Sequence, residues 1–89
     1  MSKAQSTAQT DTRPVQLQVN TNGAWKTVVA FDAGNDLAAE EVQRAVELLF
    51  RAEQTTQWRI AAPARSPIVL KMLSRATYGI WMTAEQEAA

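Results

Sequence analysis

The 89-residue chain contains neither cysteine nor histidine. Without cysteine it can form no disulfide or thiolate metal site, and it has no thiol nucleophile. Without histidine it lacks the side chain that most often acts as a general base or binds a metal ion. We therefore expect no metal site, no cofactor and no catalytic residues, and we predict that the protein is not an enzyme.

Glycine and long apolar runs are also scarce. The three glycines, Gly23, Gly34 and Gly79, do not have the spacing of a phosphate-binding loop. No run is long and apolar enough to span a bilayer, and no secretory signal is recognisable at the N-terminus. The formal net charge is zero, so no overall attraction to nucleic acid or to membranes is expected. These absences predict a cytoplasmic protein.

One segment, residues 35–54, has a clear helical pattern. Asn35 is a suitable N-cap, because its side-chain oxygen can accept a hydrogen bond from the first turn. The polar side contains two i,i+4 pairs in the favourable order, Glu40–Arg44 and Glu47–Arg51. The apolar stripe comprises Ala38, Val42, Ala45, Val46, Leu49 and Ala52, with Leu37, Leu48 and Phe50 on its flanks. Since an isolated helix of this length is marginal in water, we expect the stripe to be buried on strands.

The segment before this helix, residues 15–32, has the alternation of a β-hairpin. A two-residue Asn22-Gly23 loop would place Val19 opposite Lys26. A three-residue loop that also includes Thr21 would place Val19 opposite Trp25. We predict the three-residue loop with a left-handed glycine, because directly opposed residues share a face and this register brings the apolar rows together.

After the helix, residues 57–62 are predicted to form a strand and residues 63–67 a loop. Residues 68–76 fit either a helix capped by Ser66-Pro67 or a strand; we favour a strand at 68–73 and a last strand at 78–83. The predicted fold is α+β: an antiparallel sheet of four or five strands in the order β-β-α-β-β(-β), with one amphipathic helix packed on one face. We expect a disordered tail at residues 1–13 and a single domain at 14–84.

Several short runs resemble those of known proteins: Gly23-Ala24-Trp25-Lys26-Thr27-Val28, Phe31-Asp32-Ala33, residues 42–49 and Trp58-Arg59-Ile60. Over residues 15–62 the chain resembles small uncharacterised ββαβ-type proteins that are encoded on bacterial prophages or integrated mobile elements. The resemblance implies a bacterial or phage accessory protein. It assigns no functional residues.

The predicted sheet leaves one face uncovered by the helix, and we expect this open face to be a protein contact. Basic and apolar residues share it in our strand assignment, including Trp81, whereas Trp25 and Trp58 are assigned to the core. The expected contact set comprises Lys26, Val28, Arg59, Lys71, Leu73 and Trp81. A homodimer stacked sheet on sheet, or a complex with another protein, would bury this surface.

An alternative function is the binding of single-stranded nucleic acid. Residues 57–83 contain four basic residues and no acidic residue, whereas residues 32–53 contain six acidic and two basic residues. A basic sheet face with aromatic side chains can bind single strands by stacking and phosphate contacts. The residues for this alternative are Arg59, Lys71 and Arg75.

Overall fold

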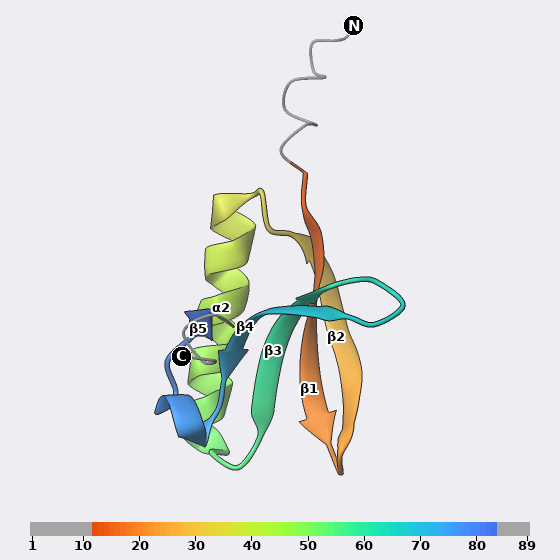
Figure 1. Ribbon diagram of the computed structural model, residues 1–89. Helices are drawn as coiled ribbons and strands as arrows, with labels where there is room; N and C mark the ends of the chain where they lie inside the picture. Colours follow the sequence, from red (N-terminus) through yellow and green to blue (C-terminus); the bar gives the residue numbers. More distant parts are fainter. Residues whose placement is uncertain (1–11, 84–89) are drawn as a thin grey trace, which may run out of the picture.

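The computed structural model describes residues 12–83, which form a five-stranded antiparallel sheet and one long helix (Figure 1). The elements are β1 (Pro14–Thr21), β2 (Ala24–Asp32), α2 (Asp36–Ala52), β3 (Gln57–Ala62), β4 (Ile68–Leu73), the 3-10 helix η1 (Arg75–Thr77) and β5 (Met82–Thr83). The strand order across the sheet is β2-β1-β3-β4-β5. The predicted α+β fold is confirmed, and residues 68–73 form a strand as expected. Of the predicted tail at 1–13 and domain at 14–84, residues 1–11 and Ala84 lie outside the described part.

The hairpin turn differs from the prediction. Thr21 pairs with Ala24, so the loop has two residues, Asn22 and Gly23, both with positive φ angles of 55° and 87°. The predicted three-residue loop is therefore wrong, and Val19 lies opposite Lys26. Asn-Gly readily adopts left-handed backbone conformations, and such a tight turn matches the natural twist of the two strands.

A β-bulge at Val28 then shifts the register of the hairpin. The pairs closest to the turn follow the two-residue loop, but beyond the bulge Leu17 lies opposite Val29 and Val15 opposite Phe31. An extra residue in one strand changes the alternation, so all residues between the bulge and one end of that strand point to the opposite face of the sheet. The apolar rows are thereby brought together, although by a bulge and not by the turn.

Helix α2 begins as the sequence predicts. The side chain of Asn35 accepts a hydrogen bond of 3.0 Å from the backbone N–H of Ala38. In Figure 1, α2 lies beside the β3–β4–β5 half of the sheet, and β2 forms the distant edge. The sheet is twisted, since the first part of β4 crosses the direction of β1 and β2 (Figure 1).

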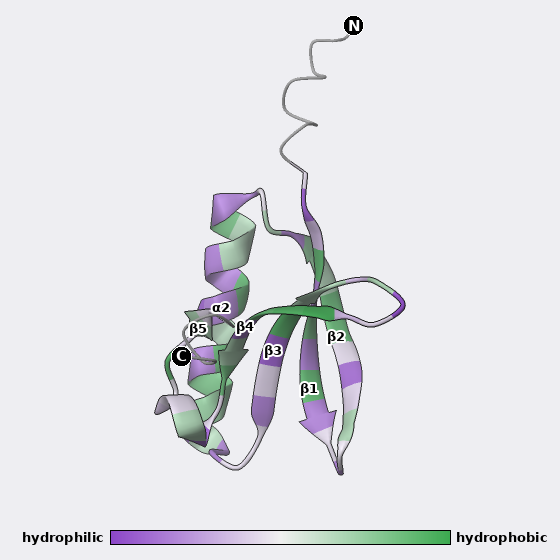
Figure 2. Ribbon diagram, viewed as in Figure 1, coloured by the Kyte–Doolittle hydropathy of each residue, from purple (hydrophilic) through white to green (hydrophobic). Residues whose placement is uncertain are grey.

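The core lies between α2 and the side of the sheet that faces it. Its buried apolar members are Val15, Leu17, Val46, Phe50, Ile60 and Leu73. Hydrophilic residues alternate with hydrophobic ones along β1 (Figure 2), which is the pattern of a strand with one dry face. Within residues 12–83, no helix combines the length and the hydropathy that crossing a membrane requires.

Candidate interaction surfaces

The structure does not bring the six predicted contact residues together. Arg59 lies on the open face, and Val28 is 54% exposed at the bulge of β2. Lys26 is opposite Val19 and therefore on the helix-facing side. A second bulge, in β4, makes Leu70 the extra residue and places Lys71 opposite Ile60, also on the helix-facing side.

Two members of the predicted set belong to the interior. Leu73 has no exposed surface and packs in the core. Trp81 is half-buried against the core, and its indole N–H donates a hydrogen bond of 3.0 Å to the backbone oxygen of Gln43 in α2. The prediction that both lie on the open face is therefore wrong. Leu73 faces the helix because the bulge at Leu70 reverses the faces on which the following residues of β4 lie.

The open face is polar and its side chains bond to one another. The guanidinium of Arg59 lies 4.2 Å from the centre of the Trp25 ring, and its Nε donates to Gln18 Oε1 at 2.7 Å. Gln18 Nε2 in turn donates to Gln16 Oε1 and Thr27 Oγ1, each at 3.2 Å. Trp25 is thus part of this polar network and not of the core as predicted, whereas Trp58 does pack against the core.

This network changes what the open face can do. Burial lowers the pKa of Arg59, and both its planar face and its Nε are already engaged. Because the polar groups satisfy one another, the face is not the apolar patch that sheet-on-sheet stacking requires. The residues of the nucleic-acid alternative do not converge either: Lys71 lies on the helix-facing side, and Arg75 lies in η1.

Besides exposed apolar residues on β2 and β4, such as Val28 and Ile68, a group of exposed apolar residues lies on α2. Only Val46 and Phe50 of the helix are buried, and both point toward the sheet. At about 100° per residue, four further apolar residues lie between about 60° and 160° from Val46 on one side of the helix. This α2 flank consists of Ala45, Leu48, Leu49 and Ala52. All four are exposed, Leu48 by 57% and Leu49 by 54%.

Charged residues border the α2 flank at its two ends. Glu41 lies one turn before Ala45, and Arg51 lies beside Leu48 on the helix surface. The described residues form one ion pair, Arg44–Glu40 at 3.7 Å. The predicted Glu47–Arg51 pair is wrong, and within residues 12–83 neither Glu41 nor Arg51 has an ionic partner.

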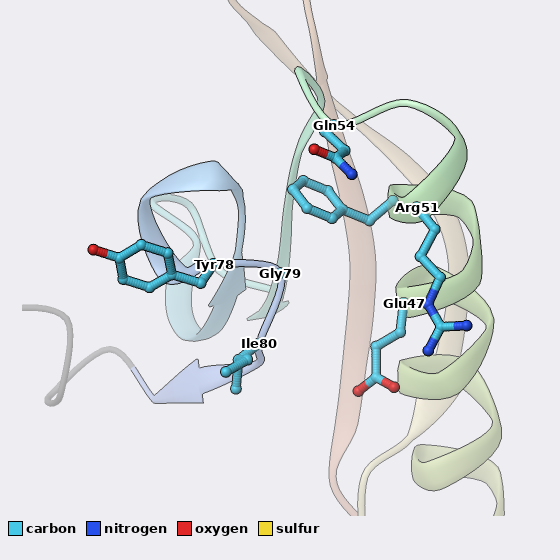
Figure 3. A pocket seen from close by; sticks show the side chains of 7 residues that line it. Glu47, Arg51, Gln54, Tyr78, Gly79 and Ile80 are labelled. Carbon is cyan, nitrogen blue, oxygen red and sulfur yellow. The ribbon is translucent and has the colours of Figure 1, made fainter.

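A surface pocket of about 390 Å³ lies on the other side of α2, against the turn that follows η1 (Figure 3). It is lined by Glu47, Phe50, Arg51, Gln54, Tyr78, Gly79 and Ile80. Tyr78 projects away from α2 in Figure 3, and 88% of its surface is exposed. Gly79 has a φ of 73°, and a Cβ at this position would lie 3.0 Å from a ring carbon of Phe50.

Neither surface was predicted from the sequence. The signal for the α2 flank was the width of the apolar stripe, since a helix packed on one surface needs only a narrower one. The signal for the pocket was an aromatic residue directly before a glycine, Tyr78-Gly79, in a segment that was predicted to be a strand. Among residues 12–83, no group of three or more acidic or other metal-binding side chains is placed to hold a metal ion.

Comparison with protein-family models, with characterised proteins and with solved structures gives no match for this chain.

Proposed function

We propose that this chain is a non-enzymatic interaction protein that forms a homodimer through the α2 flank. One observation carries the proposal: four apolar side chains on one side of the only long helix in the described part are left uncovered by the domain. Contiguous apolar surface on a small protein commonly marks a protein contact. We further propose that it is a cytoplasmic accessory protein of bacterial or phage origin, as expected from the sequence.

The charges at the ends of the α2 flank favour a second copy in antiparallel orientation. Glu41 and Arg51 are ten residues apart, roughly 15 Å along the helix axis. In a two-fold antiparallel pair, Glu41 of each copy approaches Arg51 of the other, so the pairing occurs twice. The opposed helix dipoles add to this preference.

The sizes of the side chains and of the domain support the same arrangement. Ala45 and Ala52 allow two helix backbones to approach closely, while Leu48 and Leu49 supply the apolar area. A chain of this length buries only about 60% of its unfolded surface, so a dimer adds area that a monomer lacks. Because the formal net charge is zero, no overall charge repulsion opposes the association of two copies.

The test is sedimentation equilibrium at micromolar concentration with matched apolar-to-acidic substitutions. We expect a dimer for the native chain and a monomer for Leu49→Glu, because each copy would bury a charge in the interface. Val28→Glu is the control, since Val28 is equally exposed, at 54%, but lies on β2. A native monomer, or a dimer disrupted by Val28→Glu and not by Leu49→Glu, would contradict the proposal.

Charge reversal tests the antiparallel orientation separately. Glu41→Arg and Arg51→Glu should each weaken the dimer, and combining them should restore it, because the pair is re-formed with opposite signs. If the double variant is as weak as the two single changes together, the helices do not pair in this register.

A further inference from the structure

The turn after η1 holds Tyr78 in a conformation that tyrosine disfavours. Its φ and ψ angles are 60° and 31°, in the left-handed region that glycine and asparagine adopt more readily. The side chain offers no compensation within the domain. It is 88% exposed, and its hydroxyl group forms no hydrogen bond within the described residues.

The turn is built without the tyrosine ring. Ser74 and Thr77 form a capping box, in which Thr77 Oγ1 accepts from the backbone N–H of Ser74 at 3.0 Å. The backbone N–H groups of Tyr78, Gly79 and Ile80 donate to carbonyl oxygens of Arg75, Ser74 and Thr77, at 3.0 to 3.1 Å. These bonds fix the backbone of the turn, so an aromatic residue is held at its tip on a defined backbone. Aromatic side chains are favoured anchors in protein contacts, because they supply a large contact area with few rotatable bonds.

The neighbouring pocket indicates what the turn contacts. Phe50 contributes only the small part of its ring that is exposed, 7% of the residue, and the opposite wall comes from Gly79 and Ile80, which is 60% exposed. Around it, α2 presents an acceptor in Glu47, a donor in Arg51 and both in the amide of Gln54. Glu47 and Arg51 form no ion pair with each other or with another described residue.

This rim of opposite charges selects a neutral ligand. An anion at Arg51 would be opposed by Glu47, and a cation at Glu47 would be opposed by Arg51. A peptide backbone suits the rim, because its N–H and C=O groups can bond to Glu47, Arg51 and Gln54 together. The volume of about 390 Å³ is at the lower end of the range for ligand sites, so it suits a side chain and adjoining amides and not a folded element.

We propose that this pocket and the Tyr78 turn form a docking site for an extended segment of another protein. One apolar side chain of the segment enters beside Phe50, its amides bond to the rim, and Tyr78 and Ile80 pack against the residues on either side. The site lies on the side of α2 opposite to the α2 flank. Of the residues that line the pocket, only Arg51 also takes part in the proposed homodimer, so the two proposals are tested separately with variants that leave Arg51 unchanged.

The experiment is a titration of the ¹⁵N-labelled chain with the peptide N-acetyl-Ala-Leu-Ala N-methylamide, followed by amide NMR shifts. The probe has one large apolar side chain and one residue on either side of it, so it reaches Tyr78 and Ile80 as well as the pocket. We expect shifts at Arg51, Gln54, Gly79 and Ile80, and affinity about fivefold or more weaker in Ile80→Ser. Tyr78→Asn, which suits the left-handed turn, should weaken binding similarly without unfolding the domain.

Two controls keep the outcomes distinct. Val28→Ser removes an equally exposed apolar side chain far from the pocket and should bind the probe as the native chain does. Leu49→Glu, which tests the homodimer, should also bind it normally, so the two proposals can fail separately. No shifts at the pocket, shifts confined to the α2 flank, or stronger binding of acetate or guanidinium than of the peptide would overturn the docking site.

Discussion

At the scale of single residues, Asp32 joins the start of the sheet to the start of the helix. Its carboxylate accepts hydrogen bonds from the backbone N–H of Arg13 at 2.7 Å and from that of Gly34 at 2.8 Å. The bond from Arg13, followed by that from Gly34, lowers the pKa of Asp32 below its ordinary value of 3.8. Both bonds favour the charged carboxylate, because an ionised group is the stronger acceptor.

This pKa shift predicts how the stability of Asp32→Asn depends on pH. A carboxyl group whose pKa is lower in the folded state adds stability above its unfolded pKa, and loses it as the pH falls through the folded pKa. The native chain should therefore exceed Asp32→Asn in free energy of unfolding above about pH 3.8, and the difference should narrow below it. Urea denaturation of both chains across this range is the measurement. A difference that is independent of pH would exclude the ionised carboxylate as the cause.

Substitutions at two adjacent positions of the Tyr78 turn should differ in their effect on the free energy of unfolding. Gly79→Ala should lower the free energy of unfolding by about 1–3 kcal/mol, because a left-handed φ and a close approach to Phe50 both oppose a Cβ. Tyr78→Asn should stay within about 0.5 kcal/mol of the native chain or exceed it, because asparagine tolerates this φ and no packing is lost. Denaturant unfolding compares the two. If Tyr78→Asn costs as much as Gly79→Ala, the ring supports the fold and is not free for the proposed docking site.

At the scale of elements, two β-bulges decide which side chains face the helix. Because of the bulge at Val28, Lys26 lies on the face of the sheet opposite to the one predicted for it. The bulge at Leu70 has the same effect on Lys71 and Leu73 in β4. Hydrophobic alternation predicted each strand, because a half-buried strand repeats every two residues. It could not predict the faces beyond a bulge, because one inserted residue changes the parity and leaves the strand in place.

Trp81 illustrates the contact between β5 and α2. Its N–H group bonds to the Gln43 carbonyl oxygen, and its ring packs beside the core. Trp81→Phe should cost about 0.5–1.5 kcal/mol for the lost hydrogen bond, and somewhat more for the smaller ring. Trp25→Phe is the matched control: its indole N–H donates no hydrogen bond within the described residues, so its cost should be smaller. Equal unfolding free energies for native chain and Trp81→Phe would show that this bond contributes nothing.

At the scale of the whole molecule, one helix covers only part of a five-stranded sheet. Neighbouring strands lie about 4.8 Å apart, so the sheet is roughly twice as wide as a helix with its side chains. Val29, on the helix-facing side of the edge strand β2, is accordingly 43% exposed. The apolar stripe of α2 is wider than this contact needs, and the excess forms the α2 flank.

The proposed homodimer predicts that stability depends on protein concentration. Since association stabilises only the folded chains, the urea midpoint of the native chain should rise between low and high micromolar concentration. Leu49→Glu should remove this dependence, whereas Val28→Glu should keep it. Equilibrium unfolding at several concentrations measures the effect. A native midpoint that does not move would favour a monomer and contradict the α2 flank as a contact.

The fold class, the helix and the first four strands could be inferred from local patterns, whereas the last strand, predicted at 78–83, comprises only Met82–Thr83. Periodicities of two and about 3.6 residues, an N-cap and turn-forming residues are properties of short segments, and they are readable without knowing what lies opposite. The candidate surfaces could be inferred only in part. The width of the helical stripe was visible in the sequence, but how much of it the sheet would bury was not.

Tertiary structure decided the rest, because facing and exposure depend on pairs of distant segments. The register between β3 and β4 buries Leu73 and separates Lys71 from Arg59, and the return of the chain past η1 places Trp81 on α2. The left-handed backbone of Tyr78 likewise follows from hydrogen bonds that close the turn. Sequence alone thus determined the fold class, the helix and the first four strands, while the packing between these elements determined which apolar side chains remain exposed.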